Sequence, residues 1–367
     1  MNGLLLPLLL LLVSHAFVIA AAAASGNETA GMKVMLQKNH SKMSTFLIFG
    51  DSTVDPGNNN YIATFSKSNF PPYGKDFLNH CPTGRFTNGK LVTDFIAGYV
   101  GIKETVPPYL DPTLSIEDLK SGVSFASGGS GYDPVTAGLS SVIPLQQQLD
   151  YFREYKARIQ QAIGKERANS LIKNAAFLIS CGTNDYVVNY FSTPLRQYTY
   201  SLPQYQQLVL KLVRKFILGL AAEGAQRIVV VGLPPMGCLP IVITLNSKDA
   251  FNNRHCIEKF SSAARNYNLE LQKLLHTLRR PNLELLYADI YTPLDDMITT
   301  PSKYGYTNIN SGCCGTGLLE GGILCNPNTF TCPDDSKYVF WDSVHPTQAT
   351  YYNLFKALRP TVDAFLN

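Results

Sequence analysis

The chain has 367 residues, a length that suits one large domain or two small ones. Its 31 Lys and Arg against 27 Asp and Glu give a net charge of +4, which is too mild for a protein that binds nucleic acid through a basic surface. Apolar residues make up 45% of the chain and charged residues 16%, so it can bury a sizeable core and is not intrinsically disordered.

The N-terminus has the pattern of a targeting segment. Residues 4–24 are almost continuously apolar, and the run ends in Ala22-x-Ala24, a small-residue cleavage pattern. A membrane anchor is the alternative, because about 20 apolar residues span a bilayer. The run is interrupted at His15 and no basic cluster follows it. We therefore predict a cleaved signal peptide over residues 1–24 and no stable membrane insertion afterwards.

Two glycosylation sequons follow the leader, Asn27-Glu28-Thr29 and Asn39-His40-Ser41. Both precede the first predicted core segment, so a glycan on Asn27 or Asn39 would not disturb the fold. Residues 25–44 are therefore expected to form an N-terminal segment. The leader and the sequons together predict a protein that is secreted, to the extracellular space or the cell wall.

The chain has eight cysteines and no C-x-x-C pair, which argues against a structural zinc site. In an oxidising compartment some of them should pair. Cys238 with Cys256 is one candidate pair, and Cys181, at the end of an apolar run, is predicted to be a buried thiol. A second, local group consists of Cys313, Cys314, Cys325 and Cys332. Spacing alone does not fix the connectivity.

Short apolar runs alternate with longer segments of helical period. Five runs predict buried strands, at residues 45–50, 123–126, 176–181, 227–232 and 283–289. Helices are predicted at residues 143–163, 203–223, 254–280 and 347–366. Alternating strands and helices indicate a parallel sheet with helices on both faces, and such sheets carry their chemistry beyond the carboxyl ends of the strands.

A serine follows the first predicted strand, in Gly50-Asp51-Ser52-Thr53. A nucleophile held at a strand-to-helix turn keeps its backbone N–H free to bind an oxyanion, which suits Ser52. The same residues also make an ordinary polar turn.

A glycine-rich loop, Ser127-Gly128-Gly129-Ser130-Gly131, follows the second predicted strand. Glycine lets a backbone N–H approach a ligand closely. The spacing is neither G-x-G-x-x-G nor G-x-S-x-G, which disfavours a dinucleotide site and disfavours Ser130 as an α/β-hydrolase nucleophile. A flexible loop is the alternative interpretation.

Asn184 follows the third predicted strand, in Gly182-Thr183-Asn184-Asp185. A carboxamide at a strand end can donate a hydrogen bond to a developing oxyanion. An Asx turn or a helix N-cap is an equally good interpretation, because Asn and Asp favour both.

Near the C-terminus, His345 alone among the histidines beyond the leader has an acid three residues before it, Asp342. At that spacing a carboxylate can hold the imidazole in one tautomer. The other assigned histidines, His80, His255 and His276, are predicted to be surface or packing residues. No H-E-x-x-H motif or carboxylate cluster suggests a metal.

In their order along the chain, these segments resemble the plant-type GDSL esterase/lipase family of the SGNH hydrolases. The segments are FGDS, GVSFASGGSG, CGTND and FWDSVHPT, and further matches are DPGNNN, PPYGKDF, PTGRFTNGK, GLPPMGCLP and CCGTG. The resemblance runs from about Thr45 to the end. It implies a single hydrolase domain over residues 45–367. The implied fold is a flavodoxin-like three-layer α/β/α sandwich with a five-stranded parallel sheet.

The resemblance also implies roles for particular residues. Ser52 would be the nucleophile, His345 the general base and Asp342 the residue that orients it. The oxyanion hole would use the Ser52 N–H, the Gly129 N–H and the Asn184 side chain.

Two details of the second segment qualify the assignment of the oxyanion hole. Gly128 is the nearby alternative to Gly129 as a donor. Ser124 stands where the family usually has Asn, a departure that concerns a supporting hydrogen bond near the hole.

The resemblance implies an esterase or lipase that hydrolyses a small-molecule or lipid ester through an acyl-enzyme, without a cofactor. An acyltransferase with the same triad and an alcohol acceptor is one alternative. A catalytically silent binding protein on the same scaffold is another, although such a protein should have lost residues of the triad or the hole.

Overall fold

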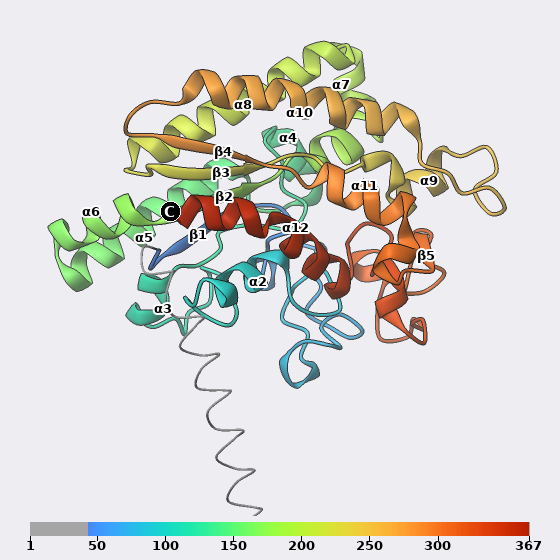
Figure 1. The fold of residues 1–367 in the computed structure, drawn as a ribbon, viewed down its shortest axis with the longest axis horizontal. Coiled ribbons are helices and arrows are strands. Elements are labelled where there is room, and N and C mark those ends of the chain that lie inside the picture. The colour runs from blue at the N-terminus through green and yellow to red at the C-terminus, as the bar shows by residue number, and fades with distance from the viewer. Residues whose placement is uncertain (1–42, 367) are drawn as a thin grey trace, which may run out of the picture. The chain divides into compact units, whose positions relative to one another are not determined.

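The central sheet is built from short, continuously apolar runs that all point in one direction. The computed structural model describes residues 43–366, so the predicted signal peptide and both candidate glycosylation sites, Asn27 and Asn39, lie outside the described residues. The strands pair in parallel in chain order (Figure 1). They are β1 (Phe46–Gly50), β2 (Ala176–Ser180), β3 (Arg227–Val231) and β4 (Glu284–Ala288).

The expected fifth strand, residues 123–126, lies along the free edge of β1 but does not form a regular strand. The Ile48 N–H donates to the Val123 carbonyl over 3.1 Å, and the Phe125 N–H donates to the Ile48 carbonyl over 2.7 Å. Gly122 precedes this segment at a φ of +105°, so the extended conformation begins only at Val123. The main sheet therefore has four strands and one bridged segment. Their spatial order is still that of a flavodoxin-like fold.

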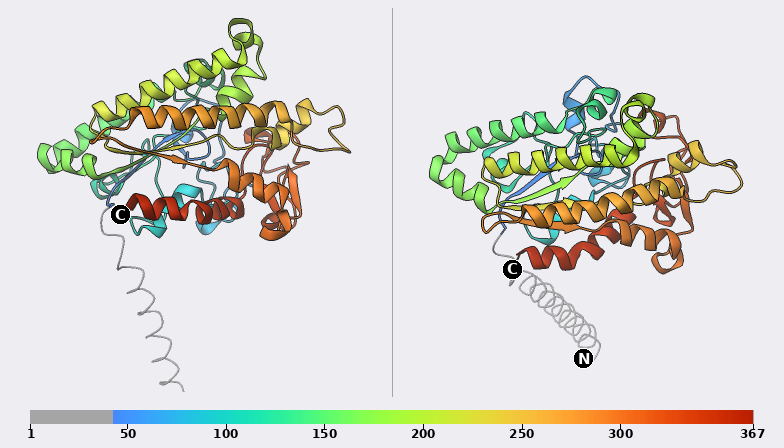
Figure 2. Two further views of the ribbon diagram at one scale, coloured as in Figure 1. Left: turned by 45° about the horizontal axis from the view of Figure 1, so that its top comes forward. Right: turned by 90° about the horizontal axis from the view of Figure 1, so that it is seen from above.

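Helices cover both faces of the sheet, which makes three layers (Figures 1 and 2). One face packs against α5, α8 and α10, and the other packs against α2 and α12. The four predicted helices are present with ends close to those expected, since each has an apolar stripe facing the sheet. The longer helices are α2 (Val92–Tyr99), α5 (Leu145–Ile163), α8 (Leu202–Ala222), α10 (Glu258–Leu278) and α12 (Gln348–Leu366).

The remaining helices are short or peripheral. None of the helices within residues 43–366 is long and apolar enough to cross a membrane. These helices are α3 (Ile116–Ser121), α4 (Pro134–Ser140), α6 (Lys165–Asn174), α7 (Pro194–Thr199), α9 (Pro240–Asn246) and α11 (Tyr291–Thr299).

A second, two-stranded parallel sheet lies beside the main one and carries the end of the chain into α12. It pairs β5 (Asn308–Gly312) with β6 (Tyr338–Phe340), and the sequence patterns did not predict it. Its strands are short and only partly apolar, so their period is hard to detect. Two disulfides, Cys313–Cys332 and Cys314–Cys325, staple the loop between these strands.

The third disulfide joins Cys238 to Cys256, the candidate pair from the sequence. Cys181 is a buried free thiol, as expected, and Cys81 is an exposed one.

Candidate active site

The turn that carries Ser52 is held in place directly after β1. Gly50 has a φ of +141°, and a Cβ at this position would lie 1.8 Å from the Ser180 carbonyl oxygen, so only glycine fits. The buried Gln148 amide accepts a hydrogen bond from the Gly50 N–H and donates one to its carbonyl, both over 2.9 Å. These contacts fix the strand end from which Ser52 projects.

Ser52, His345 and Asp342 form a hydrogen-bonded chain. The Ser52 Oγ lies 2.8 Å from the His345 Nε2, and the His345 Nδ1 lies 2.7 Å from the Asp342 Oδ2. Asp342 also accepts the backbone N–H groups of Val344 (2.8 Å) and His345 (2.6 Å), which closes a tight turn around its carboxylate. The imidazole is thereby held with Nε2 toward the serine.

Tyr73, from a distant part of the sequence, extends this series of hydrogen bonds at its Asp342 end. Its buried hydroxyl donates to the Asp342 Oδ2 over 2.7 Å and accepts the Gly322 N–H over 2.8 Å. Burial, together with the neighbouring Asp342 carboxylate, raises the pKa of Tyr73 well above its usual value. The hydroxyl therefore stays protonated and remains a donor. In the sequence, only the position of Tyr73 in the PPYGKDF segment points to such a role.

A second carboxylate, Asp51, directly precedes Ser52 and lies buried in the same turn. It accepts hydrogen bonds from the backbone N–H and the hydroxyl of Thr53, over 3.0 and 2.8 Å. Burial raises the pKa of Asp51 to about 6, against the opposing effect of those hydrogen bonds and of His345. We interpret Asp51 as a residue that shapes the turn.

The three candidate oxyanion donors differ in their surroundings. Among residues 43–366, neither the Ser52 N–H nor the Gly129 N–H has a hydrogen-bond partner. The Gly128 N–H donates to Asp55 over 2.9 Å, so this alternative donor is already engaged. Asn184 uses one of its two amide hydrogens to bind the Ser130 carbonyl over 2.9 Å, which leaves the other for a ligand.

One apolar cavity contacts several of these residues. Ser52, Asn184 and His345 line it, whereas Gly129 does not and instead lies against Ser66 and Ser140. The structure thus brings the serine, the histidine and the carboxamide to one opening, with the Gly129 loop beside it.

The DPGNNN segment connects the glycine-rich loop to the turn that carries Ser52, a function that sequence patterns did not reveal. The Asp55 carboxylate accepts the N–H groups of Gly57, Asn58 and Gly128. The buried Asn58 amide donates to the Ser124 and Ala126 carbonyls, each over 2.8 Å. The bonds to Ser124, Ala126 and Gly128 join residues 66 to 73 positions apart, so local patterns do not show them.

Ser124, the departure from the family pattern, retains a supporting hydrogen bond. Its hydroxyl donates to the Val54 carbonyl over 2.8 Å, and the Ala126 N–H donates to the Ser124 hydroxyl over 3.2 Å. The smaller side chain therefore still bridges the second segment and the chain after Ser52.

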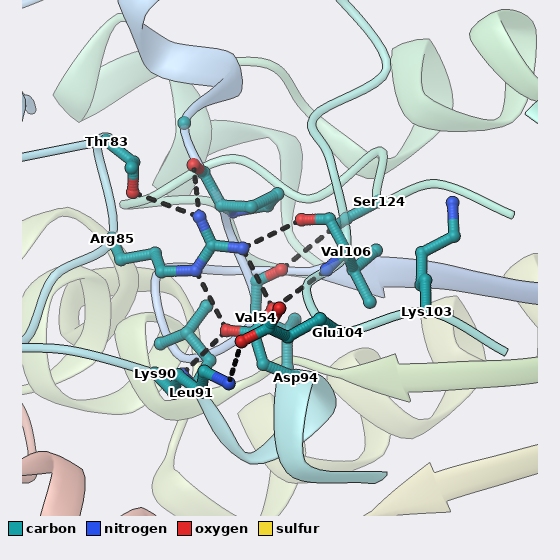
Figure 3. Close-up of polar contacts among 12 residues, drawn as sticks. Val54, Thr83, Arg85, Lys90, Leu91, Asp94, Lys103, Glu104, Val106 and Ser124 are labelled. Atoms are coloured by element: carbon teal, nitrogen blue, oxygen red, sulfur yellow. Dashed lines mark hydrogen bonds and ion pairs between the residues drawn. The ribbon is translucent and has the colours of Figure 1, made fainter. Parts of the chain in front are cut away.

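A buried ion pair between Arg85 and Asp94 lies beside the DPGNNN segment (Figure 3). Two guanidinium nitrogens of Arg85 bind the two carboxylate oxygens of Asp94 on α2, each over 2.9 Å. Arg85 also donates to the Val106 carbonyl over 2.8 Å and to the Pro56 carbonyl over 3.3 Å. Pro56 lies in the DPGNNN segment, so the ion pair connects that segment to α2.

Among residues 43–366, the other histidines and the acids do not form a metal site. His80, His255 and His276 are exposed, in agreement with a surface role. Within the described part of the chain, no group of three or more His, Cys, Asp or Glu side chains could hold a metal ion.

A family model described as GDSL-like lipase/acylhydrolase matches residues 46–358. The chain belongs to this family. It is 54% identical to the GDSL esterase/lipase At5g45960 of Arabidopsis thaliana over 334 residues, which cover 90% of this chain and 89% of that protein. It is 46% identical to the Arabidopsis thaliana GDSL esterase/lipase At1g06990, over 85% of this chain and 87% of that one. The GDSL protein is accordingly a carboxylic ester hydrolase, and its substrate is a small-molecule ester.

Proposed function

We propose that this protein hydrolyses carboxylic esters through a Ser52–His345–Asp342 triad and a covalent acyl-enzyme. The observation that carries the proposal is the continuous chain of hydrogen bonds from the Ser52 Oγ through the imidazole to the Asp342 carboxylate. Nucleophile, base and orienting acid in contact in this order are what acyl transfer to a serine requires.

In the first half of the reaction, His345 takes the proton of Ser52 through Nε2 as the Ser52 Oγ attacks the ester carbonyl carbon. The carbonyl oxygen becomes an oxyanion that accepts hydrogen bonds from the Ser52 N–H and the free amide hydrogen of Asn184, with the Gly129 N–H as a third candidate donor. The C–O bond to the alcohol then breaks, and the imidazolium gives its proton to the leaving alkoxide.

In the second half, water attacks the acyl-enzyme while His345 again accepts the proton. Collapse of the second tetrahedral intermediate breaks the Ser52–acyl bond, releases the carboxylic acid and returns the proton to the serine. The Asp342 carboxylate stabilises the imidazolium in both halves without taking its proton.

Labelling with an organophosphonate ester tests the choice of nucleophile. The reagent should phosphonylate Ser52 and abolish hydrolysis of p-nitrophenyl esters, and peptide mapping should locate the label. Label on Ser130, or full inhibition without label on Ser52, would contradict the proposal.

An acyltransferase would share the triad and the acyl-enzyme. Product analysis with and without added glycerol separates the two activities, because a transferase would convert most of the acyl groups to glycerol esters. Hydrolysis that continues at the same rate to free acid supports the hydrolase.

We also infer that the protein is secreted. The apolar leader, the two sequons and the three disulfides all fit an oxidising, extracytoplasmic compartment. N-terminal sequencing of the mature protein should begin near Ser25, and a membrane-bound product that begins at Met1 would refute this inference.

A further inference from the structure

The cavity that opens at Ser52 does not end at the triad. It continues between the sheet and α12, where its lining comes from β2, β3 and the inner face of the helix, for example at Leu178, Val229 and Leu354. Its far end is lined by Phe46, at the start of β1, and by Phe365, at the end of α12. Helix α12 runs along this face of the sheet from the side of the triad toward the C-terminus (Figures 1 and 2).

Some side chains on this face of the sheet keep more accessible surface than their neighbours on the other face. On the face covered by α12, Leu178 and Val231 keep 6% and 7% of their surface exposed. Their neighbours Ile179 and Val230, which point to the opposite face, are fully buried at 0%. An unfilled apolar space lowers stability, so a space of this kind that reaches the reacting serine suggests a binding function.

The lining of the cavity defines the chemistry of its ligand. Among the described residues that line it, Asp51 is the one acidic side chain and His345 the one basic side chain, and no Lys or Arg takes part. Polar groups cluster at the Ser52 end, and the remainder is formed almost wholly by aliphatic and aromatic side chains. Such a cavity excludes charged ligands and takes up apolar ones.

Two independent measures limit the length of that ligand. Ile48, Leu178 and Val229 share one level of the sheet, two residues before β1 ends at Gly50. Ser52 lies two residues beyond that end, in a turn, so this level is at most roughly 13 Å from it. An extended chain advances roughly 1.2 Å per bond, so about ten carbons are enough to reach this level. The volume of the cavity is about 110 Å³. At roughly 10–15 Å³ for each carbon-sized group, this is room for about seven to eleven of them.

We propose that this cavity is the acyl-binding tunnel, which takes an unbranched acyl chain of about 7 to 11 carbons inward from Ser52 beneath α12. The inference rests on the proposed function, because it takes the acyl carbon to be the one that Ser52 attacks. The acyl chain then lies in the core of the molecule, and the alcohol portion of the ester faces the outer opening.

A photoreactive phosphonate tests the direction of the acyl chain in the unaltered protein. The probe is a p-nitrophenyl alkylphosphonate with a ten-carbon chain and a terminal diazirine. After it labels Ser52, irradiation should cross-link its tail to peptides that contain β2, β3 or α12. Cross-links confined to outer loops, such as the exposed loop around Ile323, would overturn the tunnel. Failure to label Ser52 at all would instead refute the proposed nucleophile.

A second test compares esters of different acyl chain length. Its readout is a ratio of two kcat/KM values for one preparation, so a fraction of misfolded protein does not change it. Val229→Phe should lower the ratio of kcat/KM for p-nitrophenyl decanoate to that for the acetate by at least about tenfold, because the new ring fills the tunnel within about ten carbons of Ser52. The matched control is Val135→Phe, at another half-buried valine that does not line the cavity. An unchanged ratio in Val229→Phe, or an equal fall in both variants, would overturn the proposal.

Discussion

The Asp342 carboxylate is the most heavily constrained group of the candidate site. It accepts four hydrogen bonds, from two backbone N–H groups of its own turn, from the His345 ring and from Tyr73. Three of these donors lie within three residues of Asp342, and the fourth comes from a segment 269 positions away. The turn thus sets the geometry of the acid and base, while Tyr73 fixes them relative to the rest of the protein.

Tyr73→Phe should lower kcat about tenfold with little change in KM. The variant loses the hydrogen bond that holds Asp342, the partner of His345, but it loses no contact with the substrate. The free energy of unfolding should fall by about 1–3 kcal/mol, since the buried Asp342 carboxylate loses a donor and the half-buried Gly322 N–H loses its acceptor. The control is Tyr267→Phe, which removes a buried hydroxyl that has no hydrogen-bond partner among residues 43–366. Equal kinetic effects in both variants would show that Tyr73 does not position the triad.

Asn184→Ala distinguishes a donor to the oxyanion from a residue of purely local structural importance. A lost oxyanion donor should lower kcat about 10²-fold or more with an almost unchanged KM. If Asn184 only supports its loop through the Ser130 carbonyl, the variant should lose about 1 kcal/mol of stability and keep its rate. Steady-state kinetics and urea unfolding on one preparation decide between the two.

At the scale of secondary structure, the sequence predicts an element correctly where the apolar pattern of that element alone is sufficient to identify it. The runs that form β1 to β4 are buried and apolar along their length, and α5, α8, α10 and α12 show a helical period. Prediction failed for the short strands β5 and β6. It also assigned a regular strand to residues 123–126, which form only isolated bridges. The candidate site residues were identified because each follows a strand or belongs to a compact motif.

Sequence patterns do not reveal the residues that hold the candidate site in place, and the reason is physical. Gln148, Asn58 and Tyr73 act through hydrogen bonds to groups between 66 and 269 positions away. Such pairs form only after the chain has folded, so neither periodicity nor local turn chemistry contains them. In the sequence these residues look like any polar residue of a loop or a helix.

The Arg85–Asp94 pair supports the loop after Ser52 from α2, and Arg85→Met should show this as lost stability. Removal of one partner leaves the Asp94 carboxylate buried without its counter-charge, which typically costs about 3–5 kcal/mol. Arg153→Met, which breaks exposed ion pairs to Asp150 and Glu223, should change stability by about 1 kcal/mol or less. Similar effects in the two variants, measured by chemical denaturation, would contradict a special role of the buried pair.

At the scale of the whole molecule, buried carboxyl groups link stability to pH. Burial raises the pKa of Asp51 and of Asp55 to about 6, and that of Asp185 to about 7. In the unfolded chain an aspartate titrates near 3.9, at roughly its model-peptide value. Between about pH 4 and pH 7 the folded state therefore binds more protons than the unfolded state does. The contribution of these groups to the free energy of unfolding falls as the pH rises through this window.

Asp185→Asn isolates one of these groups, because asparagine does not titrate. The variant loses hydrogen bonds at every pH, but only the wild-type protein has to ionise a buried group as the pH rises. Its stability deficit relative to the wild type should therefore be largest near pH 5 and shrink toward pH 8. A deficit that stays constant or grows over this range would show that the pKa of Asp185 is not raised by folding.

The proposed role of Ser52 as the nucleophile of an ester hydrolase underlies the whole mechanism. Its most direct test is kcat/KM for p-nitrophenyl acetate in Ser52→Ala, with Ser170→Ala on the outer surface of α6 as the matched control and circular dichroism to verify the fold of both. Loss of the attacking oxygen should lower the rate by about 10⁴-fold or more, while the control stays within about twofold of the wild type. A folded Ser52→Ala enzyme that still hydrolyses the ester at a rate near that of the control would contradict the account.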